Sequence, residues 1–232
     1  MKAAAIIPAA GSGERMGSGI KKPYIILQGM PLLAHALRVF AEASDISELI
    51  VTVSPGQEDF CREHVVKACA IEKPVTVVAG GFRRQDSVRN GLAAVSESVD
   101  LVMIHDGARP FVTVQMMCDA LKITMRKRAT TMAVPVKDTV AMVAKDTAVI
   151  ERTLARDRLY LIQTPQTFER ELICEAHRQA FAEGFAGTDD ASLVERLGVP
   201  VSVIMGAYDN IKITTQEDLL FAEAILQRRL NT

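Results

Sequence analysis

The sequence predicts an α/β fold, in which a mostly parallel sheet is wound with helices on both faces. Short apolar runs alternate with segments of helical periodicity from the start of the chain to Val136. A glycine-rich segment directly follows the first apolar run, as is typical of a ligand-binding loop at the carboxyl end of a strand. With 232 residues, 49% of them hydrophobic and 24% charged, the chain can bury one full core. We therefore expect a single domain over residues 1–232.

The individual elements follow from the length and period of each apolar segment. Strands are expected where the runs are short and continuously apolar, at residues 3–7, 49–53, 75–79, 101–104 and 131–136. Helices are expected where apolar residues recur on one face, from Pro31 to Phe40 and over residues 57–69, 87–95 and 113–125. A last helix is expected to begin with a capping box, Thr214-Thr215-Gln216-Glu217.

The alternation breaks between residues 137 and 154. Apolar and polar residues alternate loosely there, and Lys145-Asp146-Thr147 has the composition of a turn, so the segment predicts a β-hairpin. Two strands alone are marginally stable. We expect this hairpin, at about residues 137–157, to project from the sheet and to pack on a second subunit as a dimerisation arm.

Composition argues against several classes of protein. A net charge of −1 provides no global field toward nucleic acid or a membrane surface. The chain has no Trp and few aromatic residues, and so lacks a platform for stacking bases. No apolar run approaches the ~18 residues of a membrane span. The short apolar start meets Pro8 and is interpreted as a first strand rather than a signal peptide.

Cysteine and histidine spacings give no sign of a metal centre. The cysteines show no C-x-x-C pair and suit a reducing cytoplasm; they are Cys61, Cys69, Cys118 and Cys174. The histidines show no spacing such as His-Glu-x-x-His. His35 and His177 lie in helical patterns and are expected to be ordinary helix residues.

The segment after the first strand predicts a phosphate site. Small residues from Ala9 to Gly13 allow backbone N–H groups to close around an anion. Arg15, Lys21 and Lys22 add positive charge directly afterwards. Without these cations the segment would indicate only a tight turn, but with them it favours binding of a polyphosphate.

Two common phosphate-binding loops do not match. A dinucleotide loop requires Gly-x-Gly-x-x-Gly and an acidic residue after the second strand, whereas here the third glycine, Gly17, falls one residue too late and Ser54-Pro55 follows that strand. A P-loop requires Gly-Lys-Ser/Thr, which does not occur. The loop therefore binds phosphate in another style.

Three of the predicted strands end in candidate site residues, at positions 8–10, 80–81 and 105–106. Because ligands of such sheets bind at the carboxyl ends of strands, we expect these segments to meet in one crevice. Asp106 would there become a Mg²⁺ ligand beside a triphosphate, although an isolated Asp after a strand often only forms a turn. Asp209 is a candidate second carboxylate, with an Asx turn as the alternative.

Two basic residues near these carboxylates have different expected roles. Lys212 lies between two isoleucines in a strand-like run, which suggests a charge aimed at the site. Arg109, three residues after Asp106, is expected to be a structural ion-pair partner.

These motifs together resemble those of the 2-C-methyl-D-erythritol 4-phosphate cytidylyltransferase family, of the non-mevalonate isoprenoid pathway. The first is Pro8-Ala9-Ala10-Gly11-x-Gly13-x-Arg15-Met16 with Lys22, which alone suggests only a sugar-type nucleotidyltransferase. The others are Gly80-Gly81-x-x-Arg84-x-Asp86-Ser87-Val88, His105-Asp106-x-Ala108-Arg109-Pro110, Pro135-Val136-x-Asp138-Thr139, Arg156, Thr164-Pro165-Gln166-x-Phe168, Thr188-Asp189-Asp190-Ala191-Ser192 and Asp209-Asn210-Ile211-Lys212. They cover nearly the whole chain.

The resemblance implies a cytoplasmic, Mg²⁺-dependent homodimer of the nucleotidyltransferase type. Such an enzyme joins CTP and 2-C-methyl-D-erythritol 4-phosphate to give 4-diphosphocytidyl-2-C-methyl-D-erythritol and pyrophosphate. The substrate phosphate attacks the α-phosphorus of CTP in line, so positioning and positive charge are expected to provide the catalysis.

The resemblance also implies a role for each site residue. The expected sets are Arg15, Lys22 and Lys212 for catalysis; Ala9, Ala10, Gly11, Gly81 and Ser87 for CTP; Thr139, Arg156, Asp106 and Lys212 for the second substrate; and Asp106 and Asp209 for the metal. Thr139 and Arg156 lie at the base of the predicted hairpin, from which they would reach the partner's site.

The chain departs from the family pattern at a few positions. The basic pair before Tyr24 leaves two candidates for the catalytic lysine: alignment on Tyr24 selects Lys22, with Lys21 as a rival. Phe82 occupies a position that is often acidic, which puts a side-chain contact to cytosine in doubt. Gly107 replaces a frequent alanine.

Two alternative functions stay open. One is a cytidylyltransferase for ribitol 5-phosphate, whose relatives tend to carry Ser-Val in place of Gly107-Ala108 and to lack the setting of Thr139 and Arg156. The other is a non-catalytic nucleotide-binding protein with the same fold. The expected basic and acidic site residues are all present, which argues against this alternative.

Overall fold

The computed structural model describes residues 2–11 and 21–230. The expected catalytic role of Arg15 therefore lies outside the described residues. None of the described helices is long and apolar enough to cross a membrane.

The described strands form one large sheet and two small two-stranded ones. The strand order of the large sheet is β11-β7-β10-β6-β1-β4-β5. Its strands are β1 (Ala3–Ala9), β4 (Ile46–Val53), β5 (Val75–Ala79), β6 (Leu101–Ile104), β7 (Ala129–Pro135), β10 (Tyr160–Glu169) and β11 (Ser202–Met205). All pairs are parallel except those of β10, which runs antiparallel to both β6 and β7. The prediction of a mostly parallel sheet is confirmed.

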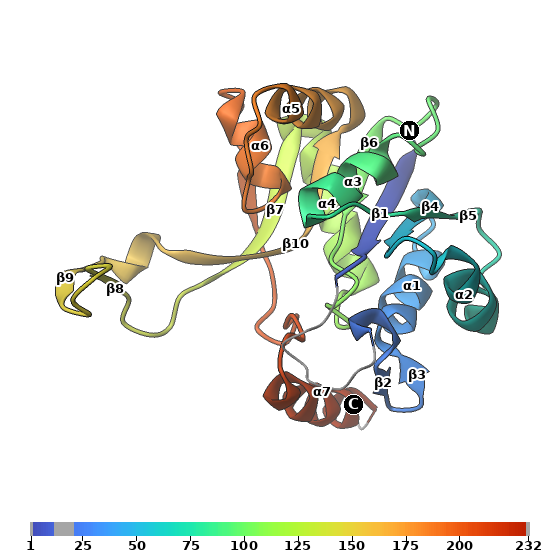
Figure 1. The fold of residues 1–232 in the computed structure, drawn as a ribbon, viewed down its shortest axis with the longest axis horizontal. Coiled ribbons are helices and arrows are strands. Elements are labelled where there is room, and N and C mark those ends of the chain that lie inside the picture. Colours follow the sequence, from blue (N-terminus) through green and yellow to red (C-terminus); the bar gives the residue numbers. More distant parts are fainter. Residues whose placement is uncertain (1, 12–20, 231–232) are drawn as a thin grey trace.

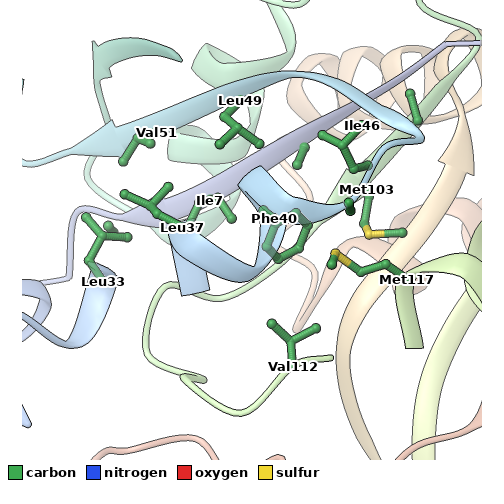
Figure 2. Close-up of a cluster of buried hydrophobic side chains, with 14 of the residues drawn as sticks. Ile7, Leu33, Leu37, Phe40, Ile46, Leu49, Val51, Met103, Val112 and Met117 are labelled. Carbon is green, nitrogen blue, oxygen red and sulfur yellow. The ribbon is translucent and has the colours of Figure 1, made fainter. Parts of the chain in front are cut away.

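Helices cover both faces of this sheet (Figure 1). One face carries α1 (Leu32–Glu42), α2 (Glu58–Cys61) and α4 (Val114–Lys127), and the other carries α3 (Arg84–Leu92), α5 (Arg170–Ala182) and α6 (Asp190–Arg196). Alternate residues of the central strand point to opposite faces, so Ile7 packs under α1 and Ile6 packs under α3. Figure 2 shows Ile7 with Leu37 and Phe40 in the first of these clusters.

Helix boundaries differ from the predictions where polar side chains cap the ends. Helix α3 begins three residues earlier than expected, because the Asp86 carboxylate accepts the Arg83 N–H at 3.1 Å and starts the helix there. In α4, the Thr113 hydroxyl accepts the Met116 N–H at 3.2 Å, so Thr113 is the cap and not the first helical residue. Residues 57–69 are helical from Glu58, in the order α2, a π turn (Arg62–Val66) and a 3-10 turn (Lys67–Cys69).

The last helix, α7 (Gln216–Leu230), packs against the end of the molecule that carries β2 (Ile26–Leu27) and β3 (Met30–Pro31) (Figure 1). Its cap lies one residue later than predicted. Asp218 Oδ2 accepts the backbone N–H of Thr214 at 2.7 Å and of Thr215 at 2.9 Å, and the Thr215 hydroxyl faces the Asp218 N–H at 3.4 Å. Asp218, rather than Glu217, closes the capping box.

Strand β10 was not predicted, although it lies in the middle of the sheet. Its buried section includes Gln163, Thr164, Gln166 and Thr167, a polar run that carries no local strand pattern. The sheet accepts these side chains because most of them find partners far along the chain; Gln166, for example, donates to Thr131 Oγ1 at 2.9 Å.

Residues 141–153 form a hairpin of β8 (Ala141–Val143) and β9 (Ile150–Thr153). Figure 1 shows this hairpin standing well away from the main sheet, on an extension that continues into the free end of β10. Apolar side chains of the hairpin are open to solvent: Val149 is 61% and Ile150 is 63% exposed.

Candidate functional site

A cavity of about 460 Å³ lies at the carboxyl ends of β1 and β6 and the loop that follows β5. Its wall contains a large part of the set expected from the sequence: Ala9, Ala10, Gly11, Lys22, Gly81, Ser87, Asp106 and Lys212. The three segments that follow the predicted strands thus meet in one crevice. The parallel sheet explains this convergence, because it aligns the carboxyl ends of its strands at one edge.

Gly80 allows the loop after β5 to approach the loop after β1. A Cβ on Gly80 would lie 2.6 Å from Ala10 Cβ and 2.8 Å from Ser87 Oγ, so no larger residue fits there. The Ser87 hydroxyl accepts the Gly81 N–H and donates to the Arg83 carbonyl, both at 3.1 Å. Ser87 therefore fixes the shape of the wall in addition to lining it.

Asp106 is the charged centre of the cavity. Its carboxylate is held between Arg84 Nε, 2.7 Å from Oδ1, and Lys212 Nζ, 2.7 Å from Oδ2. Burial opposes ionisation, but the charges of Arg84 and Lys212 outweigh it and hold the pKa of Asp106 well below its usual range. Asp106 is therefore an anion at neutral pH and is unsuited to act as a proton donor.

A hydrogen-bond chain fixes the backbone of Asp106. Its N–H donates to Thr164 Oγ1 at 3.0 Å, and that hydroxyl lies 3.0 Å from His105 Nδ1. His105 Nε2 lies 2.9 Å from the Arg109 carbonyl, which can only accept, so Nε2 carries the proton and Nδ1 accepts from Thr164. Burial lowers the pKa of His105 to about 4, so the ring is neutral at physiological pH.

Arg109 has the structural role expected from the sequence. Its guanidinium donates to the Asn210 carbonyl at 2.7 Å, and its Nε lies 4.0 Å from Asp106 Oδ2. It connects the segment after β6 to the segment that carries Lys212.

Arg84 is a site residue that the sequence reasoning did not assign. Its Nη1 donates to Asp190 Oδ2 at 2.7 Å while its Nε holds Asp106, so it bridges two buried carboxylates. Asp190 Oδ1 in turn accepts from His177 Nε2 at 3.1 Å. Arg84 and Asp190 both occur in the quoted motifs, but their contact spans 106 positions and has no local signal.

Lys22 and Lys21 differ in position. Lys22 begins a 3-10 turn (Lys22–Tyr24) and lines the cavity, whereas the described cavity wall does not include Lys21. The geometry therefore favours Lys22 as the lysine that faces a ligand.

Asp209 is placed differently from the expectation that it holds the metal with Asp106. Its Oδ2 lies 3.0 Å from both Arg228 and Arg229 of α7, and the described cavity wall does not include it. The carboxylate thus connects α7 to the preceding loop. Over the described ranges, no group of three or more His, Cys, Asp or Glu side chains is arranged to hold a metal.

Thr139 and Arg156 lie outside this cavity, on the extension that carries the hairpin. Arg156, in a 3-10 turn (Arg156–Arg158), donates to the Lys137 carbonyl at 2.7 Å and is exposed. The described part of this chain's cavity is thus formed without either residue.

The same combination of motifs occurs in proteins of known family. The family model described as IspD, 2-C-methyl-D-erythritol 4-phosphate cytidylyltransferase, matches residues 3–228, which include every element above except the last two residues of α7. The chain belongs to this family. It is therefore an enzyme of the cytidylyltransferase type, and the non-catalytic alternative is not supported.

Individual relatives agree with this membership over the full chain. The 2-C-methyl-D-erythritol 4-phosphate cytidylyltransferases of Pelotomaculum thermopropionicum and Geotalea uraniireducens are 46% and 47% identical, over 98% of this chain and 95% and 97% of theirs. A crystal structure of 4-diphosphocytidyl-2C-methyl-D-erythritol synthase from Anaerococcus prevotii superposes with a TM-score of 0.87 at 35% identity, covering 98% of this chain and 96% of that one. The cytidylyltransferase of Thermus thermophilus superposes at 0.79, with 33% identity over 98% and 100%.

Proposed function

We propose that this protein transfers the cytidylyl group of CTP to 2-C-methyl-D-erythritol 4-phosphate, giving 4-diphosphocytidyl-2-C-methyl-D-erythritol and pyrophosphate in non-mevalonate isoprenoid biosynthesis. The observation that carries the proposal is the match of residues 3–228 to the family of that name. The cavity agrees with it, because a loop of small residues faces a cluster of basic side chains around Asp106. The relatives bearing this name also favour it over the ribitol 5-phosphate alternative.

The reaction needs charge neutralisation more than proton transfer. An oxygen of the substrate phosphate attacks the α-phosphorus of CTP, and the bond to the bridging oxygen of pyrophosphate breaks. The second pKa of a phosphate monoester is about 6, so the attacking oxygen is already ionised at neutral pH. The main barrier is repulsion between anions, which Lys22, Lys212 and Arg15 are proposed to reduce.

Lys212 is suited to the incoming phosphate. Its side chain is 39% exposed while its partner Asp106 is 9% exposed, so the ammonium group is the accessible half of the pair. We propose that Lys212 contacts the substrate phosphate and that Asp106 orients Lys212 and, through it, the second substrate. Arg84 keeps Asp106 in place from the other side.

The cytidine of CTP is proposed to lie against the small residues Ala9, Ala10, Gly11 and Gly81, with Ser87 beside them. All of them line the cavity. Gly80 allows the two loops to lie in close contact, and the Ser87 hydroxyl holds the Gly81 N–H, so the backbone groups that face the nucleotide are preorganised.

A Mg²⁺ ion fits this site through a single carboxylate. Mg²⁺ keeps several waters and needs only one or two carboxylates when substrate phosphates supply the rest of its ligands. Asp106 lines the cavity and is ionised, and so meets that requirement. We propose that Asp106 holds or orients the ion together with CTP phosphates, and that the ion supplies further neutralisation of their charge. The placement of Asp209 argues against a second carboxylate ligand.

The hairpin is proposed to be a dimerisation arm. It stands away from the sheet and exposes apolar residues such as Val149 and Ile150, which a partner subunit would bury (Figure 1). Thr139 and Arg156 at its base would then reach the second substrate in the partner's cavity. A cytoplasmic location is also proposed, and the unpaired cysteines Cys61, Cys69, Cys118 and Cys174 agree with it.

The decisive experiment is pyrophosphate release from CTP and Mg²⁺ with two acceptors in parallel. We expect release with 2-C-methyl-D-erythritol 4-phosphate and none above background with ribitol 5-phosphate. Release with ribitol 5-phosphate instead would show that ribitol 5-phosphate is the acceptor. Release with neither, from folded protein that binds CTP, would contradict the proposed reaction.

A further inference from the structure

A second hollow, of about 560 Å³, lies between α3 and α5 on the face of the sheet that these helices cover. None of the residues described in its wall also lines the catalytic cavity. Figure 1 shows α5, which forms one side of this hollow, at the end of the molecule opposite α7.

The wall of this hollow combines positive charge with an apolar surface. Three arginines, Arg89, Arg170 and Arg178, line the hollow together with one acidic residue, Glu97. Arg89 also lies 3.6 Å from Asp86, and Arg178 pairs with Glu175. This leaves Arg170 as the arginine of the wall with no ion pair within the described chain. The apolar part includes Leu92, Val95 and Phe181. The Arg89 guanidinium lies 4.0 Å from the centre of the Phe181 ring, so charge and apolar surface are in direct contact.

Two buried nitrogen atoms in this wall lack partners within the described chain. They are Nε of Arg170 and Nδ1 of His177, each with almost no exposed surface. His177 is only 2% exposed, and its Nε2 is already used by Asp190 at 3.1 Å. A buried polar atom without a hydrogen bond is costly, and so an unmatched pair in a cavity wall indicates that something else supplies the partners.

We propose that the hollow between α3 and α5 binds a small organic anion in which a phosphate or carboxylate head is joined to an apolar body. The head pairs with Arg170 and, when the side chains of the wall move apart to admit it, offers the buried Nδ1 of His177 its missing partner. The neutral imidazole accepts from a hydrogen phosphate or a carboxylic acid, and the imidazolium donates to an anionic oxygen. The apolar body covers Leu92, Val95 and the exposed ring of Phe181.

This second ligand site is connected to the catalytic cavity by a continuous chain of buried polar contacts. His177 lies 3.1 Å from Asp190, Asp190 lies 2.7 Å from Arg84, and Arg84 lies 2.7 Å from Asp106. A ligand on His177 therefore acts at one end of the chain that positions Asp106. We expect it to change the affinity for CTP, within the roughly 5- to 150-fold range of ordinary allosteric coupling.

The first experiment is isothermal titration calorimetry of the full chain with hexyl phosphate, with inorganic phosphate and hexanol as probes of the two halves. Hexyl phosphate is expected to bind at least about tenfold more tightly than either half. Arg170→Gln should weaken it by about tenfold or more, the effect of one charged hydrogen-bonding partner. Arg126→Gln, on the exposed face of α4, is the matched control and should leave binding unchanged. No binding would mean that water alone fills the hollow, and equal binding by Arg170→Gln would mean that the head does not contact Arg170; either result would overturn the proposal.

Repeating the titration at saturating CTP separates this site from the catalytic cavity. A coupled second site changes its affinity by a finite factor that stops growing once CTP saturates. If the affinity for hexyl phosphate keeps falling as the CTP concentration rises, the two ligands compete for the catalytic cavity, and the assignment of a second site is overturned. If CTP leaves the affinity for hexyl phosphate unchanged, the coupling between the sites is overturned. In ¹⁵N-histidine spectra, hexyl phosphate should shift the ring nitrogens of His177, identified with His177→Gln, and leave those of exposed His64 in place. This binding test is independent of which alcohol phosphate the enzyme accepts.

Discussion

Lys212 Nζ lies 2.7 Å from Asp106 Oδ2, while Arg84 occupies the other oxygen of the same carboxylate at 2.7 Å. The two cations are not equivalent. Arg84 also pairs with Asp190, and its side chain is 27% exposed, whereas the side chain of Lys212 is 39% exposed. Arg84 thus anchors the carboxylate, and Lys212 is the more exposed of the two cations, as its proposed contact with the substrate phosphate requires. The predictions below follow from this division and from the surroundings of Asp106.

Replacing Lys22 tests which of the two adjacent lysines acts on the phosphates. Lys22→Ala is expected to reduce kcat by about 10²- to 10³-fold, the scale for loss of one preorganised group that stabilises developing charge. CTP should still bind, because the remaining cavity wall is intact. Lys21→Ala, the matched control, should have little effect. Steady-state pyrophosphate release measures both, and the reverse order of effects would assign the role to Lys21.

Separate replacement of the two candidate carboxylates tests the single-carboxylate metal site. Asp106→Asn should raise the Mg²⁺ concentration required for half-maximal rate and lower kcat. Asp209→Asn should leave the Mg²⁺ requirement unchanged but lower the Tm by about 2–4 °C, as expected for ~1 kcal/mol in a chain of this size. The measurements are Mg²⁺ titrations and thermal melts. A raised Mg²⁺ requirement in Asp209→Asn would restore Asp209 as a ligand.

Phe82 is fully exposed at the mouth of the cavity, where it is available to stack on the base of CTP. Stacking on an aromatic side chain contributes about 1–3 kcal/mol per base, so Phe82→Ala should raise the KM for CTP on the order of tenfold. Its Tm should not fall, since the ring is not packed in the core. Phe221→Ala, another exposed aromatic on α7, is the control. An unchanged KM would exclude stacking by Phe82.

His105 makes the fold sensitive to mild acid. Its pKa is lowered from 6.5 to about 4, so the unfolded chain binds a proton that the folded chain rejects. The stability from this group is therefore complete above pH 6.5 and is lost as the pH falls toward 4, by about 2 kcal/mol between pH 7 and pH 5. Urea unfolding at these two pH values should show that loss in the wild type and in His64→Gln, and a smaller loss in His105→Gln. Equal losses in all three proteins would contradict a buried neutral His105.

Mixed dimers test whether Arg156 acts across the proposed interface. Arg156→Ala and Lys22→Ala subunits should each be nearly inactive alone. In a mixed dimer, one cavity combines an intact Lys22 with an intact Arg156 from the partner, so part of the activity should return. Two affinity tags allow the mixed species to be purified and assayed. No recovery in verified mixed dimers would place Arg156 outside the partner's site.

Sequence patterns identified the parts of the fold that local physics determines. Short apolar runs predict β1 and β4 because strands buried on both faces must be apolar throughout. They could not predict β10, since the buried Gln163, Thr164 and Gln166 find their hydrogen-bond partners far along the chain. A buried polar strand of this kind therefore cannot be predicted from its local sequence pattern.

The candidate site likewise contains parts that the sequence predicts and parts that it does not. The small-residue loop and Asp106 follow strands directly, so their place at the edge of the sheet could be predicted. The bridge from Arg84 to Asp190 could not, because it joins the start of α3 to the start of α6. The ion pairs of Asp209 could not be predicted for a related reason: its partners Arg228 and Arg229 lie at the end of α7, and no pattern around Asp209 indicates them.

Strand β10 limits which insertions and deletions this protein can tolerate. One end of the strand, at Tyr160, continues into the hairpin, and Thr164 further along it holds the backbone of Asp106. Inserting or deleting one residue between these positions would turn either the hairpin or the Thr164 hydroxyl to the wrong side, because side chains alternate along a strand. The distance from the hairpin to Asp106 is thus set by the number of residues between them. Variation in this family is expected to accumulate at the tip of the hairpin and not along the strand that supports it.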